Sequence, residues 1–83
     1  MDNKEKLLNS PIKVKILKLF NEGGAEISLT FKDIKDSLNI STDSLKFQLN
    51  DLVAEGILSK KKNKYNLTNV GKELLKEIKE KGL

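Results

Sequence analysis

Four lysines in one short stretch form the densest group of charged side chains in this sequence. Lys60, Lys61, Lys62 and Lys64 surround a single asparagine and have no acid between them. Their charge of +4 equals the formal net charge of the whole chain, which carries 16 basic and 12 acidic residues. A basic patch of this density is typical of phosphate binding, and a solvated surface loop is the alternative interpretation.

The absent residue types exclude most catalytic and metal chemistry. The chain has no cysteine and no histidine, so it offers no disulfide, no thiolate nucleophile, no imidazole base and no zinc ligand of the usual kinds. Carboxylates, lysine and serine remain, but they need a pocket that a chain of 83 residues seldom builds alone. We therefore expect no enzyme, no catalytic residue, no cofactor and no metal.

The lysines fall on a predicted β-hairpin. Residues 57–61 and 64–67 have the pattern of two strands, and the two residues between them have that of a tight turn. Thr68 is placed to cap a final helix over 68–81, in which apolar residues recur at helical spacing. The sequence therefore places the basic cluster at the tip of a hairpin that is followed by a helix.

The elements before the hairpin are mainly helical. Pro11 suits the first position of a helix that ends near residues 23–24, and residues 4–9 have the pattern of a separate short helix. Residues 25–29 alternate like a brief strand. Thr30 and Asp33 form a capping-box pattern that predicts a helix over 31–38. Asn39 and Ser41 then allow a tight turn into a helix over 42–55.

The helix over 42–55 has two contrasting faces. Its core stripe consists of Leu45, Leu49, Leu52 and Val53, so Phe47 and Asn50 fall on the opposite side. Residues 42–59 nevertheless carry a net charge of −2, which disfavours contact with a polyanion. An apolar Phe47 on the outer face is either buried against the hairpin or an interaction site.

Four stretches occur in the order and spacing of a known family of regulators. They are 10–17 (SPIKVKIL), 29–38 (LTFKDIKDSL), 40–58 (ISTDSLKFQLNDLVAEGIL) and 65–71 (YNLTNVG). Together they resemble transcriptional regulators of the ArsR/MarR type. The resemblance implies a mainly α fold with a small β-hairpin (α+β), a winged helix-turn-helix. It would form a single domain over 1–83, with the helix-turn-helix at about 31–55, the wing at about 57–67 and the C-terminal helix at about 68–81.

The resemblance also implies sequence-specific or semi-specific binding of double-stranded DNA by a small transcriptional regulator. The recognition helix 42–55 would lie in the major groove and the lysine-rich wing on the backbone or in the minor groove. The implied DNA contacts are Thr42, Asp43, Ser44, Lys46, Phe47, Asn50, Lys60, Lys61, Lys62 and Lys64. Lys46 suits a phosphate, Asn50 an adenine edge and Phe47 a thymine methyl group, while Asp43 can instead simply favour the helix N-terminus.

Family members mostly act as homodimers, and a dimer interface at Leu74, Leu75 and Ile78 is expected if this stripe is exposed. Closure of the monomer core is the alternative role of these residues. No apolar run is long enough to span a membrane, so the chain is expected to be cytoplasmic. Two other functions stay open: a winged helix that docks a protein through Phe47 and the acidic side of residues 42–59, and a nonspecific architectural DNA binder.

Overall fold

The helices and strands follow the order that the sequence predicts. The computed structural model describes residues 10–22 and 27–82. Its elements are α2 (Pro11–Glu22), β1 (Leu29–Thr30), α3 (Phe31–Leu38), α4 (Thr42–Ala54), β2 (Leu58–Lys61), β3 (Lys64–Leu67) and α5 (Asn69–Lys81). The helix expected over 4–9 and the end of the first helix at residues 23–24 lie outside the described residues.

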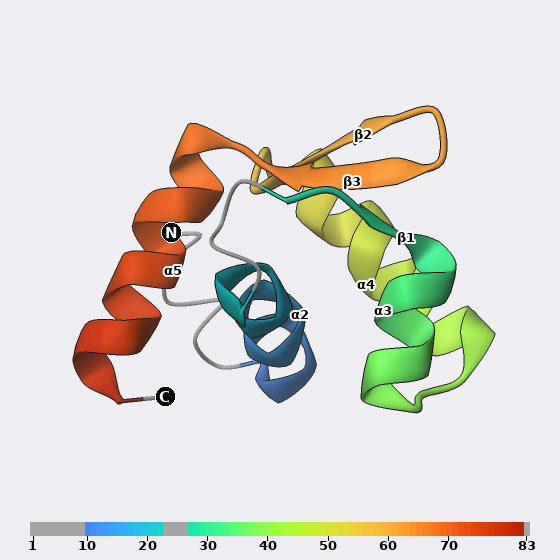
Figure 1. Ribbon diagram of the computed structural model, residues 1–83, viewed down its shortest axis with the longest axis horizontal. Helices are drawn as coiled ribbons and strands as arrows, with labels where there is room; N and C mark the ends of the chain where they lie inside the picture. The colour runs from blue at the N-terminus through green and yellow to red at the C-terminus, as the bar shows by residue number, and fades with distance from the viewer. Residues whose placement is uncertain (1–9, 23–26, 83) are drawn as a thin grey trace.

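A three-stranded antiparallel sheet of order β1-β3-β2 lies along one side of the helices (Figure 1). In β1, Leu29 pairs with Tyr65 and Thr30 with Lys64. The predicted strand over 25–29 is therefore misplaced, since Ile27 and Ser28 lie outside the strand. The alternating pattern marked the right segment, but among its described residues only Leu29 pairs with β3 through the strand ladder, together with the capping residue Thr30.

Side-chain caps set the ends of the helices that carry the site. Thr30 and Asp33 form the predicted capping box, in which each side chain accepts a hydrogen bond of 3.1 Å from the other residue's backbone N–H. Asn39 ends α3 in the left-handed conformation with φ 53°, and Ser41 Oγ accepts from the Ser44 N–H at 3.2 Å to begin α4. These caps turn the chain sharply between α3 and α4, as the helix-turn-helix prediction requires.

The hairpin is tied to α5 by a close contact. Thr68 Oγ1 lies 2.6 Å from the Gly56 carbonyl oxygen and also accepts from the Gly71 N–H at 3.0 Å. A side chain at position 71 would place its Cβ 2.2 Å from the Ile57 carbonyl oxygen, so only glycine lets α5 approach this closely. The wing therefore leaves the body of the domain in a defined direction.

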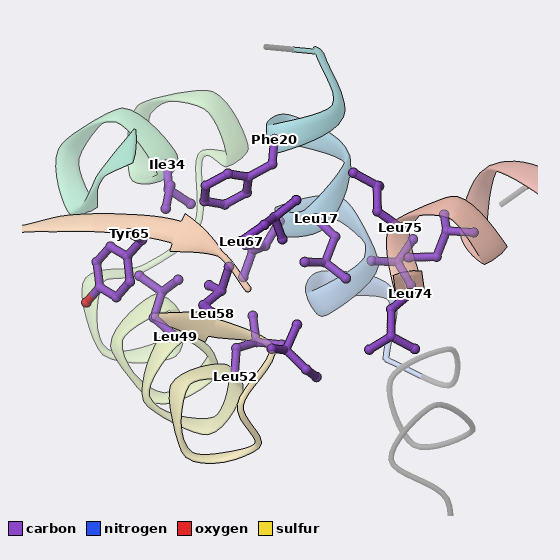
Figure 2. Packing of buried hydrophobic residues seen from close by; sticks show 14 of the residues in the cluster. Leu17, Phe20, Ile34, Leu49, Leu52, Leu58, Tyr65, Leu67, Leu74 and Leu75 are labelled. Carbon is purple, nitrogen blue, oxygen red and sulfur yellow. The ribbon is translucent and has the colours of Figure 1, made fainter. Parts of the chain in front are cut away.

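One apolar core joins all the elements (Figure 2). α2 contributes Ile16, Leu17 and Phe20, and α4 contributes the predicted stripe Leu45, Leu49 and Leu52, all without exposed surface. Figure 2 shows Phe20 beside Ile34 of α3, and Tyr65 beside Leu49. The buried face of α4 thus fixes which of its side chains point outward.

The expected dimer stripe belongs to this core. Leu74, Leu75 and Ile78 are only 6%, 3% and 0% exposed in the single chain, and Figure 2 shows Leu74 and Leu75 among the core side chains. In the single chain these three side chains therefore close the monomer core, and a dimer interface at them stays a prediction. The face of α5 that carries them packs against α2, although Leu74 also lines an open surface hollow with Val70 and Glu73.

The described part of the chain contains no helix that is both long and apolar enough to cross a membrane. Within the same residues, no three acidic side chains lie together as a metal site.

Candidate nucleic-acid interface

The outer face of α4 presents the side chains that the sequence predicts. With Leu45, Leu49 and Leu52 buried, Phe47 is 65% exposed, so it is no part of the core. Its neighbours on this face, Thr42, Asp43, Lys46 and Asn50, are also exposed, and Ser44 is half-buried beside the cap. The helix therefore offers a solvent-facing surface that combines an ammonium group, an amide, short hydroxyls and an aromatic ring.

The strand register decides which lysines of the hairpin face α4. Lys60 pairs with Tyr65, and Leu58 pairs with Leu67, and directly opposed residues share a face of the sheet. Tyr65 is 4% exposed and packs into the core. The Lys60 Nζ lies 5.6 Å from the centre of the Tyr65 ring, within the range of a cation–π contact. Lys60 is thus held on the inner face.

A groove runs between α4 and this inner face of the hairpin. Its lining consists of Phe31 at the start of α3, Lys46 and Asn50 on α4, and Lys60, Asn63 and Tyr65 on the hairpin. Two ammonium groups and two side-chain amides meet here, and no acid is among the described lining residues. Ammonium and amide N–H groups are donors suited to phosphate oxygens and base edges. The groove can therefore hold a nucleic-acid backbone beside α4.

The other lysines of the hairpin lie elsewhere. Lys61 pairs with Lys64, so both point to the outer face, away from Lys60 and Tyr65. Lys62 occupies the turn with φ 59°, a left-handed conformation that favours glycine or asparagine. The four lysines that read as one patch in the sequence are divided between two faces and a tip.

Lys13 was not predicted to take part in the interface, yet it contacts the C-terminal half of α4. Its side chain is 6% exposed, and its Nζ lies 2.9 Å from Asp51 Oδ2 and 3.6 Å from Glu55 Oε1. The first contact is also a hydrogen bond. Lys13 precedes Ile16, Leu17 and Phe20 at the i, i+3, i+4, i+7 spacing of the buried stripe. This spacing is visible in the sequence and could have predicted that Lys13 lies on the buried face of α2.

This contact changes the electrostatics expected for α4. The charge of −2 on residues 42–59 came from Asp43, Asp51 and Glu55 against Lys46. Two of these three acids lie beside Lys13, which belongs to α2. The net negative charge of residues 42–59 is therefore partly offset by a lysine that is far away in the sequence. The third acid, Asp43, lies in the first turn of α4, at the other end of the helix from Asp51 and Glu55. A negative charge at this position interacts favourably with the helix dipole.

The order of the elements, the capped turn between α3 and α4 and the projecting hairpin define the chain as a winged helix-turn-helix domain. The model of the family described as "Methanogenesis regulatory protein FilR1, N-terminal domain" matches residues 2–80, and the chain belongs to this family of regulatory domains.

A solved structure supports the fold. The chain is similar to the structure titled "Protein structure of type III plasmid segregation TubR mutant", with 21% sequence identity and a TM-score of 0.80 over 95% of this chain and 88% of that one. No curated protein matches the chain. The resemblance to ArsR/MarR regulators is thus confirmed as far as a winged helix-turn-helix regulator, and the narrower assignment to that family stays a prediction.

Proposed function

We propose that the domain binds double-stranded DNA and regulates transcription, with α4 in the major groove and the hairpin against the adjacent backbone. The observation that carries the proposal is the groove beside α4, where Lys46, Asn50, Lys60 and Asn63 meet without an acid among the described lining residues. The chain belongs to a family whose description names a regulatory protein, and this membership supports the same role.

The proposed contacts divide by chemistry. Lys46 and Lys60 bind backbone phosphates, which position the domain, and Asn50 pairs with an adenine edge, which carries sequence information. Phe47 contacts a thymine methyl group from the centre of the exposed face. Thr42, Asp43 and Ser44, at the start of α4, lie where a helix N-terminus approaches the backbone.

The test is a titration of a duplex selected from a random pool, followed by fluorescence anisotropy at several salt concentrations. The double variant Lys46→Gln/Lys60→Gln should bind all sequences more weakly, and its log–log salt slope should fall by about 0.9 per lost phosphate contact. Asn50→Ala should lose about 1–3 kcal/mol on the selected site with little change of slope, because a base contact releases no counterions.

The matched control is Lys76→Gln/Lys79→Gln, which removes the same charge from exposed positions in the second half of α5. The C-terminal end of this helix lies far from the tip of the hairpin (Figure 1). The control should keep both the affinity and the slope nearly unchanged. If the control loses as much as the groove variant, binding follows net charge alone and the domain is a nonspecific binder. If neither variant nor the wild type binds any duplex, the proposed function is wrong.

Protein docking is the second candidate, because Phe47 is a large apolar side chain that is 65% exposed. A protein partner would bind with weak salt dependence and would be lost on Phe47→Ala, whereas the groove lysines could be replaced without effect. If the domain binds DNA instead, replacement of the groove lysines should weaken binding.

Homodimerisation is part of the proposal only through the ArsR/MarR resemblance, since Leu74, Leu75 and Ile78 are buried in the single chain. Sedimentation velocity with and without the selected duplex tests it, and a monomer in both conditions would exclude it.

A further inference from the structure

The solvent-facing side of α5 carries an open hollow that is separate from the groove beside α4. Its lining consists of Val70, Glu73, Leu74, Lys76, Glu77 and Glu80. Three of these residues are acids and one is a lysine, so the lining has a net charge of −2, although the whole chain carries +4. Val70 is 51% exposed. The α5 hollow therefore combines an acidic surface with an exposed apolar side chain.

The glutamates of the α5 hollow repel one another. Glu73, Glu77 and Glu80 follow at spacings of four and three positions, so they lie on one side of the helix, and like charges at a spacing of four destabilise it. Glu73 and Glu80 are exposed, and neither forms an ion pair within the part of the chain that the structure describes. A positively charged partner would remove this repulsion.

The hairpin between β2 and β3 is the complementary surface of the same chain. Its four lysines, Lys60, Lys61, Lys62 and Lys64, are exposed and form no ion pair with the other described residues. Lys61 and Lys64 are directly opposed across the strands, and like charges in this arrangement are also destabilising. The tip of the hairpin lies far from the C-terminal end of α5 (Figure 1). The two surfaces can therefore meet only when they belong to different copies of the chain.

We propose that the hairpin of one copy docks in the α5 hollow of another, with Lys61 and Lys64 against its glutamates. The exposed Val70 suits this occupant, because lysine lays its methylene groups along apolar surface while its ammonium group stays with water or an acid. The contact joins two different surfaces, so it is head-to-tail and differs from a symmetric dimer through α5. It also covers the lysines that the proposed function places on DNA, so DNA competes with the assembly; this consequence alone rests on the proposed function.

The first experiment measures self-association of the full chain by sedimentation velocity at about 0.01 M salt, where the Debye length is about 30 Å, and at about 1 M, where it is about 3 Å. The wild type should associate at the lower salt concentration and dissociate at the higher one. Glu73→Gln/Glu80→Gln should weaken association by roughly 2–30-fold, the range for loss of two exposed ion pairs. The matched control, Asp36→Asn/Asp43→Asn, removes the same charge from exposed positions on α3 and α4 and should associate like the wild type.

A charge exchange tests whether these two surfaces meet each other. The hollow variant Glu73→Lys/Glu80→Lys makes the α5 hollow basic, and the hairpin variant Lys61→Glu/Lys64→Glu places acids on the hairpin. Neither variant should associate with itself, because its hairpin and its hollow no longer attract each other. An equimolar mixture of the two should associate at the lower salt concentration, since the acids on one hairpin then face the lysines in the other hollow. Circular dichroism checks that both variants fold.

Two results would overturn the inference and leave the proposed function intact. The wild type or the mixture could stay monomeric at the lower salt concentration, which would make the α5 hollow a solvated surface. Alternatively, the hairpin variant could associate with itself as well as the wild type does, which would mean that a symmetric dimer or another surface joins the copies. A wild-type assembly that binds the selected duplex without dissociating would contradict the competition with DNA. Absence of DNA binding by the wild type would instead be a failure of the proposed function, and the charge exchange would still decide the inference.

Discussion

Replacement of Lys13 by methionine tests the contact that links α2 to the recognition helix. Methionine keeps most of the apolar stem and removes the ammonium group, which lies 2.9 Å from Asp51 and 3.6 Å from Glu55. Removal of one partner of a buried ion pair costs about 3–5 kcal/mol. The Asp51 side chain is 40% exposed and keeps part of its hydration, so we expect a smaller loss, about 2–3 kcal/mol.

Such a loss is large for a domain of this size, whose total stability is roughly 4–12 kcal/mol. In a thermal melt followed by circular dichroism, Lys13→Met should lower Tm by roughly 10–20 °C. The triple variant Lys13→Met/Asp51→Asn/Glu55→Gln should recover much of that loss. In Lys13→Met two carboxylates remain near the C-terminal end of α4 after the lysine charge has been removed, and the triple variant replaces both of them by neutral amides.

The matched control is Lys32→Met. Its Nζ lies 2.9 Å from Asp36 Oδ2, the same length as the Lys13–Asp51 contact, but the two side chains are 84% and 64% exposed. Water screens this pair, so the control should melt like the wild type. If Lys13→Met also melts like the wild type, burial does not strengthen the contact, and the reasoning that Lys13 holds α2 against α4 is wrong.

Three further predictions concern exposed positions. Phe47→Ala should weaken DNA or partner binding and leave Tm unchanged, whereas a loss of about 3–5 kcal/mol in denaturant unfolding would place Phe47 in the core. Lys62→Gly should raise stability by about 1 kcal/mol, because glycine accepts the left-handed conformation, and should weaken DNA binding; unchanged affinity would show that Lys62 makes no phosphate contact. Hydrogen bonds from the Thr30 backbone and side chain, and to a lesser degree the charges of Lys32 and Lys64, hold the pKa of Asp33 below its ordinary value of 3.8. Since the folded pKa is the lower one, the capping box stabilises the fold above the ordinary value and loses this contribution as the pH falls through the folded pKa. An acid titration of ellipticity should lack that step in Asp33→Asn, and an identical titration would contradict the assignment.

Local patterns were sufficient to predict most of the elements. The capping box at Thr30, the left-handed Asn39 and the Ser41 cap all involve residues within a few positions of one another, so their geometry follows from local chemistry. The α4 stripe predicted for the same reason that Phe47 lies opposite the core, since helical periodicity alone separates the two faces. Whether the hairpin covers Phe47 stayed open in the sequence, and the structure leaves the side chain 65% exposed. The extent of β1 was wrong because it depends on its partner strand.

The errors and omissions all concern distant parts of the chain. The apolar spacing of Leu74, Leu75 and Ile78 shows that one face of α5 must be covered, but it does not say whether α2 or a second copy covers it. Lys13 and Asp51 are 38 positions apart, so no local pattern joins them, although the spacing of α2 places Lys13 on its buried face.

The sequence by itself determined the helix-turn-helix, the exposed face of α4 and the concentration of positive charge in the hairpin. Each depends on spacing and capping between near neighbours. Only the tertiary structure decided that α2 covers the α5 stripe and that Lys13 offsets the acids of α4. It also decided that the strand register turns Lys60 toward α4 and Lys61 and Lys64 away from it. A register shift of one residue would exchange those faces, so the division of the lysines is a property of strand pairing rather than of composition.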